Sequence, residues 1–409
     1  MCPAFKTLDD VDVRGKVVIV RADLNSPIDP QTGMIQDNER IQAHAETLKE
    51  LAEKGARVVV LAHQGRKGDP DFLPLEQHAK LLSKHVGKPV KYVPDLIGEK
   101  AVEAVKSLRS GEILLLENVR ILDEETAEKS PEEHARGALV SKLSGLADLF
   151  VLDAFSAAHR AHASIVGFAA VLPAVAGRVM ERELKALSEI LEKRSSIILF
   201  MGGNKPDDCI KVIEALLSRR KPEIKILLSA GILGQLFLAS EGRNLGEPSM
   251  AYIRKKGFEP LIGKVRDLAA KLGDRLRKPI DVAYETNGKR EEIRVENLPA
   301  PGPIMDIGSE TASTYADIIR SASEDDAIIV KGPAGAYEHE NFRKGTAEIY
   351  RALARSKAFT LIGGGDSSTA ISLVGLRVED FSYVSLAGGA LIHYLSGGKM
   401  PGVEILMRG

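Results

Sequence analysis

The sequence predicts an α/β protein of two domains in which parallel strands alternate with helices, and three observations carry this prediction. The chain has 409 residues, which at roughly 100 to 200 residues per domain suits two domains. Short runs rich in Val, Ile and Leu recur along it, and both sides of each run look buried, as in parallel sheets covered on two faces. Long amphipathic segments separate these runs, as crossover helices separate parallel strands.

Eight apolar runs are expected to be strands. They begin at Val17, Arg57, Glu112 and Leu149 in the first half and at Ser196, Lys225, Ala327 and Phe359 in the second half. The segment between the first two runs predicts a crossover helix that is followed by Gly55 as a C-cap. Its apolar residues recur at helical spacing, at Ile41, Ala45, Leu48, Leu51 and Ala52.

Three further segments have local predictions. DVAYE from Asp281 and EEIRV from Glu291 flank a TNGK turn, which predicts a β-hairpin with a type I′ turn on the sheet edge of the second half. The charged run from Asp123 is expected to form a solvated helical excursion. Four histidines in amphipathic stretches are expected on solvated helix faces: His44, His78, His85 and His134.

The composition limits the classes of protein to which the chain can belong. Lys and Arg number 56 against 57 Asp and Glu, a formal net charge of −1, which argues against a globally basic nucleic-acid binder. The two cysteines, Cys2 and Cys209, form no disulfide framework or metal knuckle by themselves. The N-terminus lacks a secretory pattern, and the weakly polar stretch 163–177 is too short to span a bilayer. We therefore expect a cytoplasmic protein without a membrane or nucleic-acid partner.

Charged and polar side chains follow the strands of the first half. Ligands of open parallel sheets bind beyond the carboxyl ends of the strands, so these residues are candidate contacts. They are Arg21, Asp23, Asn25, His63, Arg66, Asn118, Arg120, Asp153, His159 and Arg160, with Arg40 opening the first crossover helix. Five arginines and two histidines in one crevice suit a small ligand that carries phosphate and carboxylate.

Glycine takes the corresponding positions in the second half, at GGNK from Gly202, SAG from Ser229, KGPAG from Lys331, GGGDSS from Gly363 and SLAGGA from Ser385. Glycine lets the backbone approach a ligand, and Ser367, Ser368 and Thr369 are expected to cap a helix whose free N–H groups favour phosphate. This half predicts a nucleotide site that lacks both GxxxxGK[ST] and a strand-linked GxGxxG. Two anion sites suggest phosphoryl transfer, with Lys205 and Arg40 as clamps and Asp366 as a magnesium ligand.

These blocks resemble the phosphoglycerate kinase family over essentially the whole chain, and its archaeal members in particular. The matching segments are RADLNSP, LAHQGR, LLENVR, DAFSAAHRAHAS, GPAGAYEHENFRKGT, GGGDSSTA and SYVSLAGGALIHYLSGGKMPGVEIL, in that order. The resemblance implies two Rossmann-like three-layer domains with parallel β-sheets, separated by a cleft and hinge. The implied N-terminal domain spans 1–171 and is completed by the tail at about 393–409. The implied C-terminal domain spans 172–392 and begins with an inter-domain helix at 172–192.

The resemblance also implies a reaction and its residues. The family transfers a phosphoryl group reversibly between 1,3-bisphosphoglycerate and ADP, giving 3-phosphoglycerate and ATP with Mg²⁺, in glycolysis and gluconeogenesis. The implied 3-phosphoglycerate contacts are Asp23, Asn25, Arg40, His63, Arg66, Arg120, His159 and Arg160. The implied nucleotide contacts are Lys205, Gly308, Glu338, Gly364, Gly365, Asp366 and Ser367, with Asp366 on the metal. The implied catalytic set is Arg40, Lys205, Gly365 and Gly388, with Gly389 nearby. A monomer or a small homo-oligomer is expected.

One block departs from the family pattern, which reads GGAK, two residues, then Asp and Lys. Here GGNKPDDC places Cys209 at the second lysine, and Cys209 is expected to be an inert helix residue after Pro206 at the first helical turn. Lys211 is a weak substitute, because two helical positions turn its side chain by about 200°. Two alternatives stay open: a protein that keeps both pockets without transferring phosphate, and a two-domain solute-binding protein.

Overall fold

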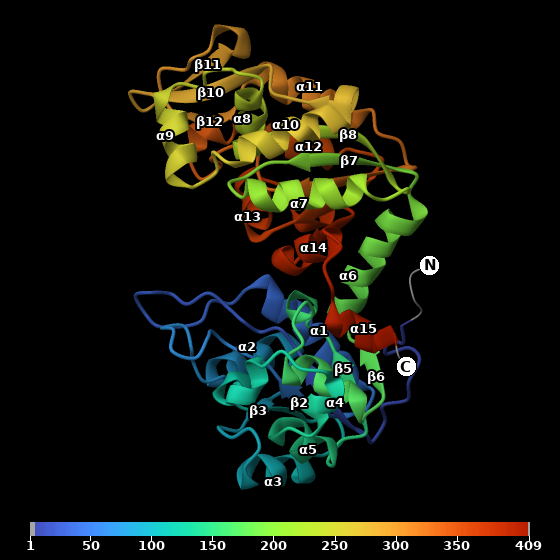
Figure 1. The fold of residues 1–409 in the computed structure, drawn as a ribbon. Helices are drawn as coiled ribbons and strands as arrows, with labels where there is room; N and C mark the ends of the chain where they lie inside the picture. The colour runs from blue at the N-terminus through green and yellow to red at the C-terminus, as the bar shows by residue number, and fades with distance from the viewer. Residues whose placement is uncertain (1–4, 408–409) are drawn as a thin grey trace. The chain divides into compact units, whose positions relative to one another are not determined.

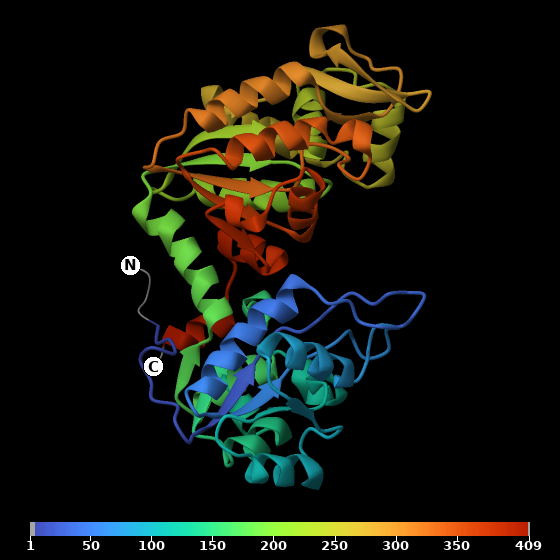
Figure 2. The same ribbon diagram turned by 180° about the vertical axis from the view of Figure 1, so that it is seen from behind.

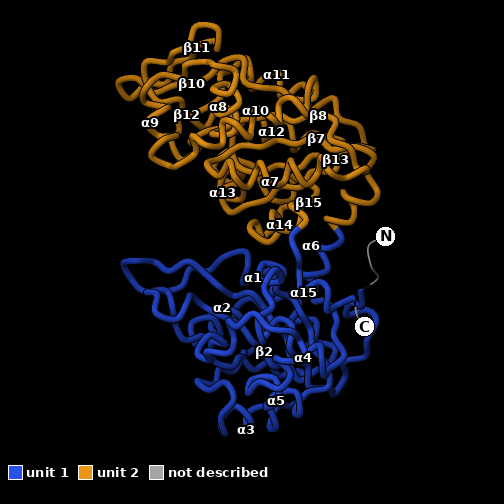
Figure 3. Tube along the Cα trace, in the orientation of Figure 1, with its two compact units in different colours: residues 1–185, 398–409 blue, residues 186–397 orange. Residues whose placement is uncertain are grey.

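The computed structural model describes residues 5–407, and the chain divides into two compact units (Figure 3). Unit 1 runs to Lys185 and includes the segment from Gly398, and unit 2 runs from Ala186 to Gly397. Unit 1 extends beyond residue 171, the boundary expected from the sequence, because strand β6 (Ala174–Ala176) pairs with β5 (Leu149–Leu152). Cys2 lies outside the described residues.

Unit 1 is built on a six-stranded sheet in the order β3-β4-β2-β1-β5-β6, and all its pairs are parallel (Figure 1). Its other strands are β1 (Val17–Arg21), β2 (Arg57–Leu61), β3 (Val90–Tyr92) and β4 (Ile113–Leu115). The helices are α1 (Glu39–Glu53), α2 (Glu76–Val86), α3 (Glu99–Ser107), α4 (Pro131–Ala135), α5 (Ala138–Ser144), the first part of α6 (Arg178–Ser188), and α15 (Pro401–Glu404).

Helix α1 is the crossover helix that the sequence predicts. All five residues of its predicted apolar stripe are buried. Asn38 caps its N-terminus by accepting bonds from the backbone of Arg40 and Ile41, and Gly55 follows its end with φ of +82°, as a left-handed C-terminal residue requires.

Unit 2 is built on a second parallel six-stranded sheet, in the order β15-β14-β13-β7-β8-β9. Its strands are β7 (Ser196–Met201), β8 (Glu223–Ser229), β9 (Leu276–Arg277), β13 (Asp326–Lys331), β14 (Phe359–Gly363) and β15 (Tyr383–Ser385). The helices are α7 (Pro206–Leu217), α8 (Gly231–Ser240), α9 (Glu247–Lys255), α10 (Leu261–Leu272), α11 (Ser309–Arg320), α12 (Lys344–Leu353), α13 (Gly365–Leu373) and α14 (Gly388–Leu395).

The central strands of unit 2 are buried on both faces. Ile198 and Phe200 of β7 pack in one core cluster with helices α11 and α12, while the alternate residues Ile197 and Leu199 are also fully buried. This burial explains the continuous apolar runs, and all eight predicted strands are confirmed. The sequence reading missed β3, β6, β9 and β15, which have only two or three residues each. Strand β4 is equally short, but the four consecutive apolar residues 113–116 indicated it.

The predicted hairpin exists, but its predicted place was wrong. Strands β10 (Asp281–Thr286) and β11 (Lys289–Arg294) are antiparallel, and Asn287 and Gly288 have φ of 50° and 73°, as a type I′ turn requires. The hairpin joins β12 (Ile304–Ile307) in a separate three-stranded sheet and not the edge of the six-stranded one (Figure 2). Edge strand β9 is the neighbour of β8 instead.

Three of the four histidines expected on solvated faces are buried, so that prediction was wrong for them. His44, His78 and His134 are 2%, 0% and 3% exposed. Each has a partner inside unit 1: Asp153 for His44, Gln64 for His78 and the Ala161 carbonyl for His134. An imidazole ring can be buried when one of its nitrogens forms a hydrogen bond. Helical periodicity in the sequence does not reveal whether such a partner is present.

The C-terminal segment packs within unit 1. The Gly402 amide donates to the Ala158 carbonyl at 2.9 Å, and a Cβ on Gly402 would lie 2.9 Å from the Ala158 Cα. Glycine is therefore required there by close packing. Over residues 5–407 no helix combines the length and the apolar composition that crossing a membrane demands.

The start of helix α11 is held by a buried aspartate from strand β10. Asp281 accepts hydrogen bonds from the Glu310 amide at 3.0 Å and from the Thr311 amide at 2.8 Å. Gly308 precedes the helix, and a Cβ there would lie 2.1 Å from the Asp281 carboxyl carbon. Close packing against this cap accounts for the glycine at position 308.

We predict that Gly308→Ala destabilises unit 2, because the new methyl group displaces the Asp281 carboxylate from its helix cap. The expected loss of unfolding free energy is about 1 to 3 kcal/mol, the usual cost of overpacking. Gly263→Ala is the matched control: Gly263 lies inside α10 with no heavy atom near its Cβ position. That change should stabilise by about 0.5 to 1 kcal/mol. Differential scanning calorimetry compares them, and equal shifts of both variants would contradict the packing explanation.

Candidate functional site

The carboxyl ends of the unit 1 strands bring Arg40 and His63 close to Asp23. Arg40, at the start of α1, places a guanidinium nitrogen 3.0 Å from Asp23 Oδ2 and donates to the Asn25 carbonyl at 3.2 Å. Burial opposes ionisation of Asp23, but the charge of Arg40 and a hydrogen bond from Ser156 hold its pKa well below the usual range. A permanently ionised Asp23 therefore orients Arg40.

His63 is held in one tautomer by a buried arginine. Arg21, which is 1% exposed, donates to Ser164 Oγ at 2.8 Å and places another guanidinium nitrogen 3.0 Å from His63 Nδ1. Because a guanidinium can only donate, Nδ1 accepts, and Nε2 carries the proton. Burial and the positive charges of Arg21, Arg120 and Arg160 lower the pKa of His63 well below 6.5, so a neutral ring presents Nε2–H as a donor.

The remaining predicted cations differ in burial. Arg120 is 7% exposed and bonds the Gly65 carbonyl, and burial, together with Arg160 and Arg21, lowers its pKa to about 10. Arg66 is exposed, and Arg160 donates to His159 at 3.2 Å. Besides burial, neighbouring positive charge lowers the pKa of Arg120 and His63, and an anionic ligand would neutralise that charge.

The sequence reading missed a buried carboxylate beneath this cluster. Glu125 is 0% exposed, so the prediction of a solvated excursion was wrong at this residue. Burial raises the pKa of Glu125, while Arg21 opposes that shift, and Ser164 donates to it from its amide and its hydroxyl at 2.9 and 2.7 Å. Its place in a run of exposed charges hid it from periodicity arguments.

Two of the residues predicted as ligand contacts at strand ends form hydrogen bonds that stabilise unit 1 instead. Asp153 accepts from the amides of Val179 and Met180 at 2.8 and 3.2 Å, which caps helix α6, and it also bonds His44. Asn118 is 1% exposed and donates to the Gln64 carbonyl at 2.8 Å. Their polar groups are satisfied by the protein, which leaves the arginines to face a ligand.

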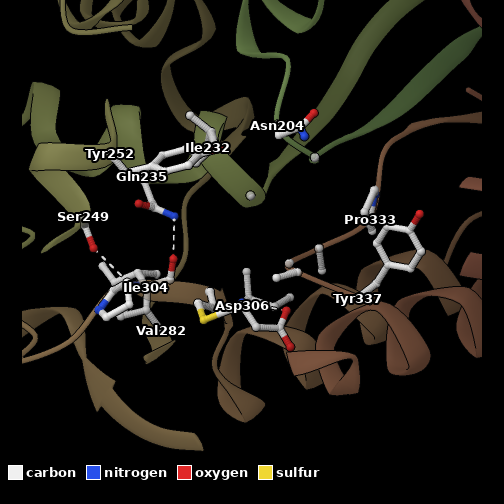
Figure 4. Close-up of a pocket in the computed structure, with 18 of the residues that line it drawn as sticks. Asn204, Ile232, Gln235, Ser249, Tyr252, Val282, Ile304, Asp306, Pro333 and Tyr337 are labelled. Carbon is white, nitrogen blue, oxygen red and sulfur yellow. Dashed lines mark hydrogen bonds between the residues drawn. The ribbon is translucent and has the colours of Figure 1, made fainter. Parts of the chain in front are cut away.

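Unit 2 contains a cavity of about 480 Å³ (Figure 4), within the range of small-molecule sites. Apolar residues such as Ile232, Val282 and Pro333 form much of its wall. Among its polar lining residues, Gln235 donates to the Ile304 carbonyl at 3.2 Å, and Ser249 accepts from the Ile304 amide at 2.9 Å. Mostly apolar walls with a few directed polar groups suit a flat heterocycle.

The cavity wall formed by β12 is supported by a buried ion pair. Oδ2 of Asp306 lies 2.8 Å from a guanidinium nitrogen of Arg290 and accepts a hydrogen bond from the Gly345 amide at 2.9 Å. Burial raises the pKa of Asp306 to about 6 despite Arg290, so the carboxylate is ionised at neutral pH. Neither residue was predicted, because they lie on different strands and meet only through the three-stranded sheet.

Two predicted nucleotide residues, Glu338 and Asp366, line the cavity. Gly308 does not, and its packing against Asp281 explains the glycine. Asp366 lies at the start of α13 and is exposed. Residues 5–407 contain no cluster of three or more metal-ligating side chains. A single carboxylate beside phosphates suits Mg²⁺, which keeps several waters and takes one or two protein carboxylates.

The glycine loops of unit 2 contain two kinds of glycine. A Cβ on Gly202 would lie 2.2 Å from the Pro333 carbonyl oxygen, and one on Gly388 would lie 2.6 Å from the Gly364 Cα, so these glycines let the loops pack. Apart from the adjoining residues and the backbone of their own helices, no described heavy atom lies within 4 Å of a Cβ position on Gly365 or Gly389. Open space at the starts of α13 and α14 is what a bound phosphate would occupy.

The predicted capping of α13 by its own hydroxyls was wrong. Gly364 is the N-cap residue, and no side chain in the described structure caps the helix. Ser367 Oγ instead accepts from the Gly332 amide at 3.2 Å and donates to the Gly363 carbonyl at 3.0 Å. The hydroxyl therefore joins two loops, and it leaves the first turn of the helix for another acceptor.

The block that departs from the family pattern begins helix α7. Pro206 is the first helical residue, as predicted, and Lys205 before it is exposed. Cys209 is buried with Sγ 3.7 Å from the Gly202 carbonyl oxygen, and burial raises the pKa of its thiol to about 11. The thiol is therefore neutral and inert, as predicted.

Comparisons with known proteins agree with this arrangement. The family model described as phosphoglycerate kinase matches residues 8–398. The chain is 43% identical to the phosphoglycerate kinase of Methanothermobacter thermautotrophicus over 403 residues, which cover 98% of this chain and 96% of the relative. It is 42% identical to that of Halorubrum lacusprofundi over 408 residues, 98% of each chain.

Solved structures give the same result for the fold. The crystal structure of phosphoglycerate kinase from Pyrococcus horikoshii matches with a TM-score of 0.88 at 34% identity, covering 98% of both chains. The enzyme from Coxiella burnetii matches with a TM-score of 0.82 at 30% identity, covering 99% of both chains. By its sequence over nearly the full length and by its two parallel α/β sheets, the chain belongs to the phosphoglycerate kinase family, phosphotransferases that act on a carboxyl group in glycolysis.

Proposed function

We propose that unit 1 binds 3-phosphoglycerate, that unit 2 binds ATP with Mg²⁺, and that Arg40 and Lys205 act on the phosphoryl group passed between them. The observation that carries this assignment is the excess of buried positive charge around His63 and Arg120. That excess needs an anion of high charge, and 3-phosphoglycerate carries both a phosphate and a carboxylate.

On the acid side, three arginines are assigned to ground-state binding. Arg66, Arg120 and Arg160 would hold the phosphate of 3-phosphoglycerate, since guanidinium forks match phosphate oxygens. His63 would donate through Nε2–H, with His159 beside it. Asp23 and Asn25 would accept from the substrate hydroxyl and keep Arg40 near the carboxylate, which their contacts with Arg40 support.

On the nucleotide side, the cavity would take the base, and Glu338 would accept from the ribose hydroxyls. Backbone groups of Gly364, Gly365 and Ser367 at the start of α13 would surround the phosphates, and Gly388 and Gly389 would face the terminal one. Asp366 would hold Mg²⁺, which would supply positive charge to offset the negative charge of the phosphates. The Ser367 hydroxyl is engaged in the loops, so its part would be to hold their shape.

In the proposed reaction, a carboxylate oxygen of 3-phosphoglycerate forms a bond to the terminal phosphorus of ATP. The bond from that phosphorus to the bridging oxygen breaks, and its electron pair stays on ADP. The reverse step forms ATP from 1,3-bisphosphoglycerate. No proton transfer to a protein side chain is required, so the residues act by position and charge. Arg40 and Lys205 offset the repulsion between two anions.

A protein that binds both ligands without transfer is the competing function. It would not need Arg40, Lys205 and Asp366 together, because these charges matter chiefly for the transferring group. Their presence favours the kinase. We also propose that the protein works in the cytoplasm, as a monomer or small homo-oligomer, without nucleic-acid or membrane partners, as its balanced charge suggests.

We predict that the purified protein forms ADP from ATP only when 3-phosphoglycerate and magnesium are present together. The reason is that each proposed anion site needs its own ligand and the nucleotide charge needs the metal. A coupled assay with a dehydrogenase readout measures this, with single omissions of acid and metal as controls. Equal turnover without the acid, or none under any condition, would reject the proposed function.

We predict that Arg40→Ala and Arg160→Ala affect different kinetic constants. Loss of Arg40 or Lys205 should lower kcat by on the order of 100-fold to 1000-fold, the usual cost of one charge-stabilising donor. Arg160→Ala should chiefly raise KM for 3-phosphoglycerate, because it removes ground-state binding. Steady-state kinetics at saturating ATP separate the two, and an unchanged kcat in Arg40→Ala would refute this division of roles.

A further inference from the structure

Lys331 is a buried cation at the carboxyl end of the central strand of unit 2. It ends β13 and is 8% exposed. In the sheet it lies in register with Met201 of β7 and Gly363 of β14. The two glycine loops that follow these neighbours lead into α7 and α13. Lys331 therefore lies at the edge of the sheet where the proposed phosphate site is located.

The ammonium group of Lys331 is only partly neutralised by the protein. Its one ion pair among residues 5–407 is with Asp208, at 3.8 Å between Nζ and Oδ2, which is longer than a charged hydrogen bond of about 2.7 to 2.9 Å. Its other neighbour is the Cys209 thiol, which burial keeps protonated. Buried ammonium groups are normally paired closely, so an anion at this place would complete the site.

The residue at position 209 suggests a role for Lys331. Cys209 stands where the family pattern has its second lysine, so α7 lacks that cation. Lys331 lies at the end of strand β13, and its ammonium group interacts with the side chain of Cys209 on helix α7. We propose that Lys331 binds a phosphate of the nucleotide and supplies the positive charge that position 209 no longer carries. This assignment rests on the proposed nucleotide site in unit 2.

The other cations of this region are less suited to that role. Lys211 is exposed, while Cys209 on the same helix is buried, as their difference of about 200° around the helix requires. Lys205 precedes α7 and already has the transferring group as its proposed partner. Asp208 serves as the counter-ion of Lys331 in the free protein, and the phosphate would replace it when nucleotide binds.

Isothermal titration calorimetry with ADP and Mg²⁺ tests the assignment. Lys331→Met keeps an unbranched side chain that is one atom shorter and removes its charge, so we expect about 10-fold to 100-fold weaker ADP binding, the usual effect of losing a charged hydrogen bond. Adenosine, measured by competition, should bind equally to both proteins because it has no phosphate. Lys211→Met is the matched control on α7 and should leave ADP affinity unchanged. Adenosine binding also reports that unit 2 is folded in the variants, because the proposed site for the base lies in that unit.

Charge at position 209 provides a second, independent test. In the wild-type background, Cys209→Lys should bind ADP no more tightly, because Lys331 already occupies the site and a second buried ammonium would repel it. In Lys331→Met, adding Cys209→Lys should recover at least half of the lost affinity on a logarithmic scale. Recovery would show that the charge itself matters and not the shape of Lys331.

Each outcome bears on the assignment. Weaker ADP binding with unchanged adenosine binding supports it, and an equal loss for both ligands would assign Lys331 a structural role only. Unchanged ADP affinity in Lys331→Met, or tighter binding in Cys209→Lys alone, would overturn it while leaving the nucleotide site in place. If the wild-type protein binds neither adenosine nor ADP, the proposed nucleotide site is wrong, and the proposed role of Lys331 is wrong with it.

Discussion

The parallel register of each six-stranded sheet is the constraint on which both candidate sites depend. Parallel pairing brings the carboxyl ends of all strands to one edge, so residues far apart in the sequence become neighbours there. Arg21 ends strand β1 and His63 follows strand β2, and a guanidinium nitrogen of Arg21 lies 3.0 Å from Nδ1 of His63. Lys331 meets the loops after Met201 and Gly363 for the same reason. Each site is therefore a property of the sheet and not of a local motif.

Incomplete neutralisation of buried charge is common to the two sites. In unit 1 burial and the positive charges of Arg21 and Arg120 lower the pKa of His63, burial and Arg21 also lower the pKa of Arg120, and Glu125 opposes the shifts of both arginines. In unit 2 the Lys331 ammonium has Asp208 at 3.8 Å. Burying charge without close partners costs stability, and binding a polyanion relieves that cost. The same physical argument thus connects burial to ligand choice in both units.

The glycines show how a structural requirement and a functional one can be separated. Gly202, Gly308 and Gly388 have no room for a side chain because the protein's own atoms fill the space. Gly365 and Gly389 have open space at the same place. A repeated glycine pattern in the sequence contains both kinds. Open space alone does not mark a ligand site, since Gly263 inside α10 has it as well. Gly365 and Gly389 differ from Gly263 because they lie at the starts of helices α13 and α14, where free N–H groups favour an anion.

The sequence by itself determined eight of the strands, the crossover helix α1, the type I′ turn and the family, because apolar runs, turn chemistry and the order of motifs are read directly along the chain. Short edge strands such as β9 escaped it, since two residues carry no period. Only the tertiary structure decided which polar side chains form their hydrogen bonds within the protein and which remain available to a ligand. His44 and Asp153 bond each other, and Glu125 is buried although its neighbours in sequence are charged. It also placed Lys331 near Cys209, because strand β13 pairs with β7, the strand that leads into helix α7.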